Sequence, residues 1–145
     1  MELVYKDAFK VVGMVVEADW EGLWDKMPLA WKQFLARHEE IEQRIDDRFM
    51  DISLREEDGM YKQLIGAEVA ALEDVPEGMV GMEIPRQRYL YHRHLGWVEE
   101  ITYTFERMYD WAKENRVRAG SFKIDTGYTL EGGEQEHDLY IRVEG

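Results

Sequence analysis

The stretch Phe9-Lys10-Val11-Val12-Gly13-Met14-Val15-Val16 is the starting point for the fold. It is rich in valine and too short for a helix, so it predicts a largely buried strand. Asp19 follows as a candidate helix N-cap ahead of Trp20. Pro28 fits the first turn of a longer helix, because the N–H that proline lacks needs no partner there. We expect this helix to run from about Pro28 to Ile45.

The same order of elements occurs twice along the chain. Phe49–Leu54 and Tyr61–Val69 are apolar-rich and are separated by a charged stretch that ends in Gly59, which predicts a hairpin. A second strand, a second helix and a second hairpin are expected at 87–94, 97–113, 121–130 and 137–143. The sequence therefore predicts an α+β fold made of two βαββ units with pseudo-two-fold symmetry.

The two units are expected to form one domain over residues 1–145. The first unit covers about 8–69, a connector rich in proline and glycine covers 70–85, and the second unit covers about 85–143. Each unit should form an antiparallel sheet with its helix on one face. The opposite faces are then free to form a ligand cleft between the halves.

Strand alternation predicts which side chains line that cleft. Leu139 and Ile141 share an apolar face that belongs under a helix, so Tyr140 points the other way. The same alternation puts Phe122 and Ile124 under the helix. The side chains expected in the cleft are Asp125, Tyr140, Glu68, Tyr91 and Trp24. Solvated carboxylates and ordinary core aromatics are the alternative interpretations of these residues.

Composition excludes several classes of function. The 31 acidic and 18 basic residues give a net charge of −13, which disfavours direct contact with nucleic acid. The absence of cysteine excludes disulfides, thiolate metal sites and cysteine nucleophiles. No leader-like or membrane-spanning segment is recognisable, so we expect a cytoplasmic protein without a membrane partner.

Catalytic and metal-binding motifs are also missing. No nucleophile elbow, P-loop, dinucleotide fingerprint or HExxH is present, so no catalytic residue is assigned and binding is favoured over catalysis. His92 and His94 could present two imidazoles on one strand face, but no third ligand is evident. We expect no metal and no cofactor.

Several short segments together point to a known family. These are Gly66-Ala67-Glu68-Val69, Pro76-Glu77-Gly78-Met79, Ile84-Pro85, Tyr89, His94-Leu95-Gly96 and Glu136-His137-Asp138-Leu139-Tyr140-Ile141-Arg142-Val143. Their order and spacing, over about residues 8–143, resemble the GyrI-like small-molecule-binding domain, the effector-binding module of AraC-type and MerR-type transcription regulators.

The resemblance implies a pocket for hydrophobic, cationic aromatic compounds. The family's acid on the next-to-last strand maps to Asp125, and the tyrosine of the last strand maps to Tyr140. Asp125 is shorter than the usual glutamate, Gly127 occupies the region of an aromatic residue, and Arg142 replaces a common proline.

Because the first expected strand begins within about ten residues of Met1, we expect a standalone module rather than the second half of a DNA-binding regulator. Such a module would sequester a drug or toxin, or sense it for a separate protein partner. Two alternatives on the same scaffold are a hydrolase of cyclopropane-bearing toxins and a protein that binds DNA gyrase. The natural ligand and the oligomeric state stay open.

Overall fold

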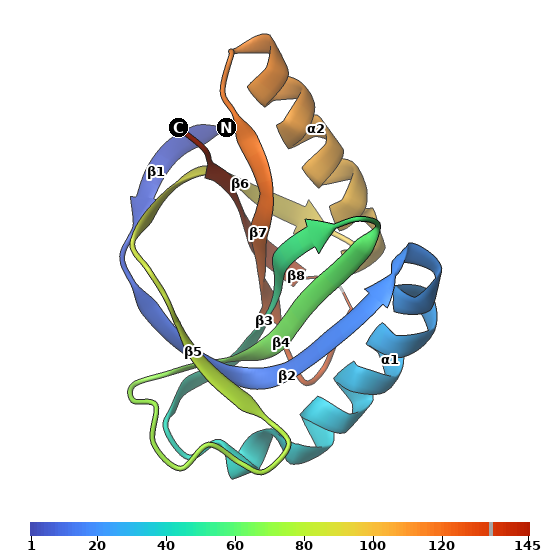
Figure 1. Ribbon diagram of the computed structural model, residues 1–145, viewed down its shortest axis with the longest axis vertical. Coiled ribbons are helices and arrows are strands. Elements are labelled where there is room, and N and C mark those ends of the chain that lie inside the picture. Colours follow the sequence, from blue (N-terminus) through green and yellow to red (C-terminus); the bar gives the residue numbers. More distant parts are fainter. Residues whose placement is uncertain (134) are drawn as a thin grey trace.

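The computed structural model describes residues 1–133 and 135–145. In this part of the chain one eight-stranded antiparallel sheet carries two α-helices (Figure 1). The strands are β1 (Glu2–Lys6), β2 (Phe9–Asp19), β3 (Arg44–Glu57), β4 (Met60–Val69), β5 (Val80–Ile84), β6 (Gln87–Gly96), β7 (Ala119–Tyr128) and β8 (Gln135–Val143). The helices are α1 (Trp20–Arg37) and α2 (Ile101–Glu114), and each has a short 3-10 turn beside it, η1 (His38–Glu40) and η2 (Val98–Glu100).

The predicted duplication is confirmed by the order of the strands. That order is β1-β6-β8-β7-β3-β4-β2-β5, so β3-β4-β2 of the first unit is mirrored by β7-β8-β6 of the second. The halves meet where β3 pairs with β7. The expectation of a separate sheet in each unit is wrong, because the two units share a single continuous sheet.

The edge strands β1 and β5 were not expected from the sequence. β1 precedes the first unit but pairs with β6 of the second, and β5 precedes the second unit but pairs with β2 of the first. The edge strand beside each unit in the sheet is therefore adjacent in sequence to the other unit. Both strands have only five residues, and β5 lies in the proline- and glycine-rich segment that was assigned as a connector. Their pairing depends on contacts between residues that are far apart in sequence, and local sequence patterns do not predict such contacts.

Helix α1 begins and ends eight residues earlier than predicted. Its N-cap is Asp19, as expected, and the Asp19 carboxylate accepts a hydrogen bond of 2.7 Å from the Gly22 N–H. The assignment of Pro28 to the first turn is wrong, because Pro28 lies inside the helix. Arg44 and Ile45 belong to β3 instead of the helix.

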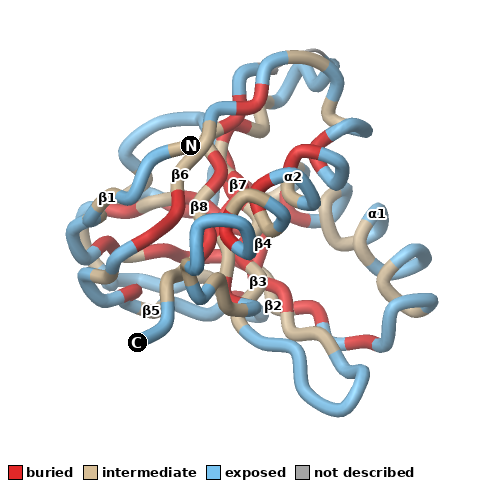
Figure 2. Tube along the Cα trace, turned by 90° about the horizontal axis from the view of Figure 1, so that it is seen from above, coloured by how far each residue is buried: buried red, intermediate tan, exposed pale blue. Residues whose placement is uncertain are grey.

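Both faces of the sheet are apolar, and this decides where the site lies. The sheet curves strongly, and α1 and α2 lie outside the curve (Figure 1). Inside the curve a separate cluster of buried side chains, among them Val11, Ile52, Leu64 and Ile124, fills the space. Buried residues follow the central strands, while much of the two helices is exposed (Figure 2). Hereafter the helix face is the side under α1 and α2, and the inner face is the opposite side.

The strand pairing shows that one predicted face assignment is wrong. Asp125 lies directly opposite Leu139, which packs under α2, whereas Ile124 lies opposite Tyr140. Asp125 is therefore on the helix face, and Phe122 and Ile124 are on the inner face. The alternation along β7 is as predicted. Apolar character alone does not tell which of two buried faces lies beneath a helix.

Candidate functional site

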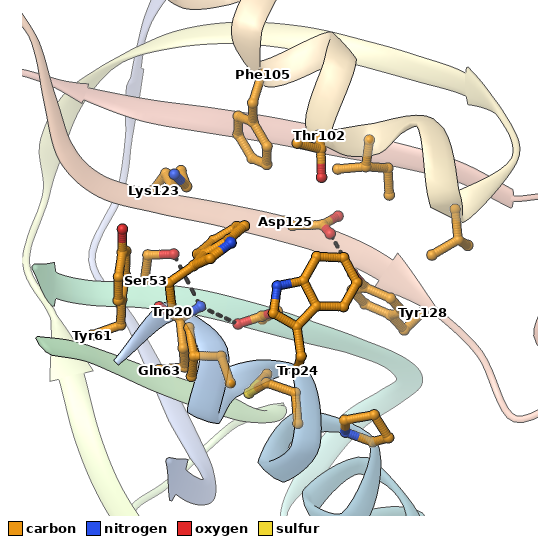
Figure 3. A pocket seen from close by; sticks show the side chains of 16 residues that line it. Trp20, Trp24, Ser53, Tyr61, Gln63, Thr102, Phe105, Lys123, Asp125 and Tyr128 are labelled. Atoms are coloured by element: carbon orange, nitrogen blue, oxygen red, sulfur yellow. Dashed lines mark hydrogen bonds between the residues drawn. The ribbon is translucent and has the colours of Figure 1, made fainter. Parts of the chain in front are cut away.

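A cavity of about 390 Å³ lies between α1 and α2, over the centre of the sheet (Figure 3). Its volume is in the range of small-molecule pockets. Its walls are apolar and come from both halves: Trp20, Trp24 and Met27 of α1 on one side, and Ile101 and Phe105 of α2 on the other. The cavity thus lies between the halves, as expected, but on the helix face.

The floor of the cavity carries two carboxylates at directly paired positions. Asp51 of β3 lies opposite Asp125 of β7, at the junction of the two halves. The Gln63 side-chain amide donates hydrogen bonds of 3.0 Å both to Asp51 Oδ1 and to Ser53 Oγ. Burial, and then the charge of Asp125, raise the pKa of Asp51 to about 7, against smaller opposing effects of Gln63 and Lys123. A second acid therefore shares the floor with the predicted one.

Asp125 is held by two protein groups. Tyr128 Oη donates to Asp125 Oδ2 at 2.5 Å, and His137 Nδ1 lies 2.7 Å from Asp125 Oδ1. A carboxylate only accepts, so His137 donates through Nδ1. Asp125 is 6% exposed and His137 is fully buried, and His137 Nε2 has no hydrogen-bond partner among the described residues. Burial and the charge of Asp125 raise the pKa of Tyr128 well above its usual value, which keeps the hydroxyl a donor.

A β-bulge at Gly127 brings Tyr128 to Asp125. The pairing of β3 with β7 shifts register between Phe49–Tyr128 and Met50–Thr126. Gly127 has a φ of +141°, and a Cβ at this position would lie 2.5 Å from the Glu136 carbonyl oxygen. Simple alternation would turn Tyr128 to the inner face, and the extra residue returns it to the helix face. A glycine inside a strand pattern was the signal in the sequence.

Aromatic side chains form the mouth of the cavity. The ring centroids of Trp20 and Trp24 are 6.0 Å apart, and those of Trp20 and Tyr61 are 5.7 Å apart. Trp20 is 54% exposed and Trp24 is 70% exposed. Such exposed indole rings beside an open cavity are free to pack on a ligand.

The cavity also contains one cation, Lys123 of β7. Its ammonium lies 5.2 Å from the centre of the Phe105 ring and 5.6 Å from the centre of the Tyr109 ring, both on α2. Burial lowers the pKa of Lys123, and the charge of Asp51 opposes this effect. Two acids and one base therefore face the same space.

The structure brings together two of the five predicted site residues. Asp125 and Trp24 line the cavity. Tyr140 and Tyr91 lie on the inner face, with ring centroids 5.1 Å apart, and the Tyr91 hydroxyl donates to Asp138 at 2.6 Å. Glu68 pairs with Val11 of the inner cluster. The predicted grouping of Asp125 with Tyr140, Tyr91 and Glu68 on one face is wrong. The face that was predicted to be open is the inner face, and buried side chains fill the space in front of it.

One of the two histidines considered for metal binding, His94, is held by other protein groups. His94 Nδ1 lies 2.7 Å from Thr104 Oγ1, and His94 Nε2 lies 2.8 Å from the Trp97 carbonyl oxygen. Within residues 1–133 and 135–145, no group of three or more potential ligands could hold a metal ion. In the same residues no helix is long and apolar enough to cross a membrane.

Residues 2–143 match the model of a protein family described as Cass2, integron-associated effector binding protein. The chain belongs to this family. The match confirms the resemblance to GyrI-like effector-binding domains over nearly the whole chain.

A curated relative is the transcriptional regulator BrlR of Pseudomonas aeruginosa, which is 32% identical over 149 residues. The alignment covers 97% of this chain and 54% of BrlR, so the chain spans about half the length of that regulator.

Solved structures share the fold at low identity. SAV2435 bound to tetraphenylphosphonium superposes with a TM-score of 0.78 at 10% identity, over 99% of this chain and 93% of that one. An integron cassette protein from the mobile metagenome of Vibrio cholerae gives 0.70 at 10% identity, over 99% and 95%. A hydrolase from Listeria innocua gives 0.62 at 12% identity, over 99% and 91%.

Proposed function

We propose that this effector-binding protein takes amphipathic aromatic cations into the cavity between α1 and α2. The observation that carries the proposal is the combination of an acidic floor, Asp51 and Asp125, with walls made largely of apolar and aromatic side chains. Aromatic faces attract a cation by about 0.5 to 2 kcal/mol. A carboxylate in a partly dehydrated cavity attracts it more strongly than the same carboxylate would in water.

Two further findings support this proposal. The net charge of −13 draws cations toward the molecule and repels anions. SAV2435, which has the same fold, was solved with tetraphenylphosphonium, an aromatic cation. Because the identity to SAV2435 is only 10%, that ligand enters as a probe and not as the natural effector.

The test compares two probes of the same shape and opposite charge. Tetraphenylphosphonium and tetraphenylborate both present four phenyl rings around a central atom. Calorimetric titration into the full chain should give saturable one-to-one binding of the phosphonium, with quenching of tryptophan fluorescence. The borate should bind at least tenfold more weakly, a difference of about 1.4 kcal/mol or more. Equal affinities would show that apolar contact alone drives binding and would contradict the proposal.

A substitution at the mouth locates the binding site. Trp24→Ala should weaken tetraphenylphosphonium binding about threefold to tenfold, because one aromatic wall is lost. Trp97→Ala is the control, since Trp97 is an exposed tryptophan as well but does not line the cavity. Equal losses in both variants would place the probe elsewhere on the surface.

A further inference from the structure

We propose that Asp51, and not Asp125, is the carboxylate that pairs with the ligand cation, and that the cation replaces a proton held by Asp51 in the empty cavity. This inference rests on the proposed function, because it assigns roles to the two acids of the same cavity.

Asp125 is poorly placed to pair with a ligand, because the protein already uses both of its oxygens. One accepts from Tyr128 and the other from His137. A ligand cation that displaced either bond would leave a buried donor without a partner, which costs about 1–3 kcal/mol. Asp125 therefore has a structural role, because it fixes Tyr128 and His137 around the floor.

Asp51 accepts fewer hydrogen bonds than Asp125 and is more accessible from the cavity. Gln63 donates to Asp51 Oδ1, and the described residues offer no donor to Oδ2. Asp51 is half-buried at the cavity floor, whereas Asp125 is buried. A free carboxylate oxygen that faces an aromatic cavity is the group that gains most from an incoming cation.

The groups around Asp51 favour its neutral form in the empty cavity. On β7 it faces Asp125, Lys123 and Tyr128, on β4 it faces Gln63, and the side chains that α1 and α2 contribute to the cavity are uncharged. Side chains at paired strand positions have Cβ atoms only about 5 Å apart, so the two carboxylates repel strongly when both are ionised. The ammonium of Lys123 packs on Phe105 and Tyr109 and offsets only part of this repulsion.

The direction of the titration agrees with this geometry, since the pKa of Asp51 is raised to about 7. At neutral pH much of the protein therefore holds a proton on Asp51. When an aromatic cation enters, the Asp51 O–H bond breaks, the proton passes to the buffer, and the carboxylate pairs with the cation. No bond of the ligand changes, and the net charge of the cavity stays the same.

Proton release can be measured directly. Tetraphenylphosphonium is titrated into the full chain by calorimetry in two buffers of different ionisation enthalpy, from pH 6 to pH 8.5. We expect release of roughly half a proton per ligand at pH 7, nearly one at pH 6 and almost none at pH 8.5, from a group with a pKa of about 7. Because binding and proton release are coupled, the affinity for tetraphenylphosphonium should rise about tenfold between pH 6 and pH 8.

Three variants assign the proton to one residue. Asp51→Asn should abolish proton release and make affinity independent of pH, whereas Asp51→Glu should retain both effects. In Asp125→Asn the release should persist but move to lower pH, because the charge that helps to raise the pKa of Asp51 is gone. Glu68→Gln removes one charge from a residue outside the cavity and should behave like the wild type.

The outcomes separate the two proposals. If the wild type binds the phosphonium without releasing a proton, or if Asp51→Asn still releases one, the inference about Asp51 is overturned while the proposed function stands. If the wild type does not bind the phosphonium even at pH 8.5, where Asp51 is ionised, the proposed function itself fails. Circular dichroism and thermal unfolding of each variant identify any loss of fold.

Discussion

Asp51 and Asp125 are the same residue type at paired positions of β3 and β7, and the protein treats them differently. Asp125 has a donor for each oxygen, and Asp51 has one amide donor on a single oxygen. The difference comes from residues that are distant in sequence, Gln63 and His137, and from the bulge that places Tyr128. Residue type alone therefore does not fix what a carboxylate does in this cavity.

The raised pKa of Asp51 predicts a specific dependence of stability on pH. Folding favours the protonated form of Asp51. The contribution of this protonated carboxyl to the free energy of unfolding is therefore complete below about pH 4 and is lost as pH rises through about 7. We therefore expect Asp51→Asn to be more stable than the wild type by about 4 kcal/mol at pH 8.5 and nearly equally stable at pH 4, because a rise in pKa from 3.8 to about 7 is worth about 1.4 kcal/mol for each pH unit. Urea unfolding followed by tryptophan fluorescence measures both values. Asp7→Asn is the control at an exposed site, and a difference for Asp51→Asn that is the same at both pH values would contradict the prediction.

The bulge at Gly127 gives a second prediction. Gly127→Ala should lower the free energy of unfolding by about 2–4 kcal/mol, because its positive φ and the close Glu136 carbonyl oxygen both oppose a side chain. Gly59→Ala is the matched control, since Gly59 also has a positive φ but has no atom within 4 Å of a new Cβ. Its cost should be about 1 kcal/mol. Equal costs would mean that the close approach at Gly127 is relaxed by small shifts.

The sequence predicted part of this cavity. Asp125 could be named because the resemblance to GyrI-like domains maps the family's acid to it, although strand alternation assigned it to the wrong face. Trp24 was named as one of several candidate aromatic residues of the cleft. Asp51 could not be found in the same way, since its role comes from pairing with Asp125, and the predicted partner acid was Glu68. Tyr140 was misplaced because alternation tells which residues share a face but not what covers that face.

At the scale of elements, the start of α1 depends on one hydrogen bond at its N-cap. Asp19→Ala should destabilise the protein by about 1 kcal/mol, because the Gly22 N–H loses its acceptor. Asp25→Ala removes the same charge from an exposed position inside the helix and should change stability by less than about 0.5 kcal/mol. The free energy of unfolding in urea decides between these values. Equal effects would mean that charge, and not capping, is what Asp19 contributes.

Element boundaries were predictable where local chemistry sets them. Asp19 marked the helix start correctly, and the two hairpins were recognised from their turns. Pro28 misled the prediction because proline is uncommon inside helices, yet packing of α1 over the sheet holds the helix together across it. The pairing of β1 with β6 and of β5 with β2 could not be predicted, because only tertiary contacts define it.

At the scale of the whole molecule, the exchanged edge strands should make the two halves unfold together. Val4 of β1 pairs with Tyr89 of β6 and packs on the inner cluster, while β1 runs directly into the first unit. We expect Val4→Asp to cost about 2–3 kcal/mol and to reduce protection of backbone amides in both halves by the same amount. Native-state hydrogen exchange of β2, β4, β6 and β8 measures this. Tyr5→Asp, at an exposed position of the same strand, is the control, and faster exchange confined to β6 and β8 would show that the halves are independent.

The pairing of β3 with β7 across the two halves has a consequence for which molecules the cavity can discriminate. The acids stand on strands that hydrogen bonding and two exchanged edges hold in place, so the position of negative charge varies little from one ligand to the next. The indole rings at the mouth are half or more exposed and can change rotamer at small cost. The acidic floor therefore selects ligands by their charge, and the aromatic mouth adapts to their shape. We expect a binder that is tolerant of shape and strict about charge, accepting aromatic cations of unlike form while refusing an anion of identical form.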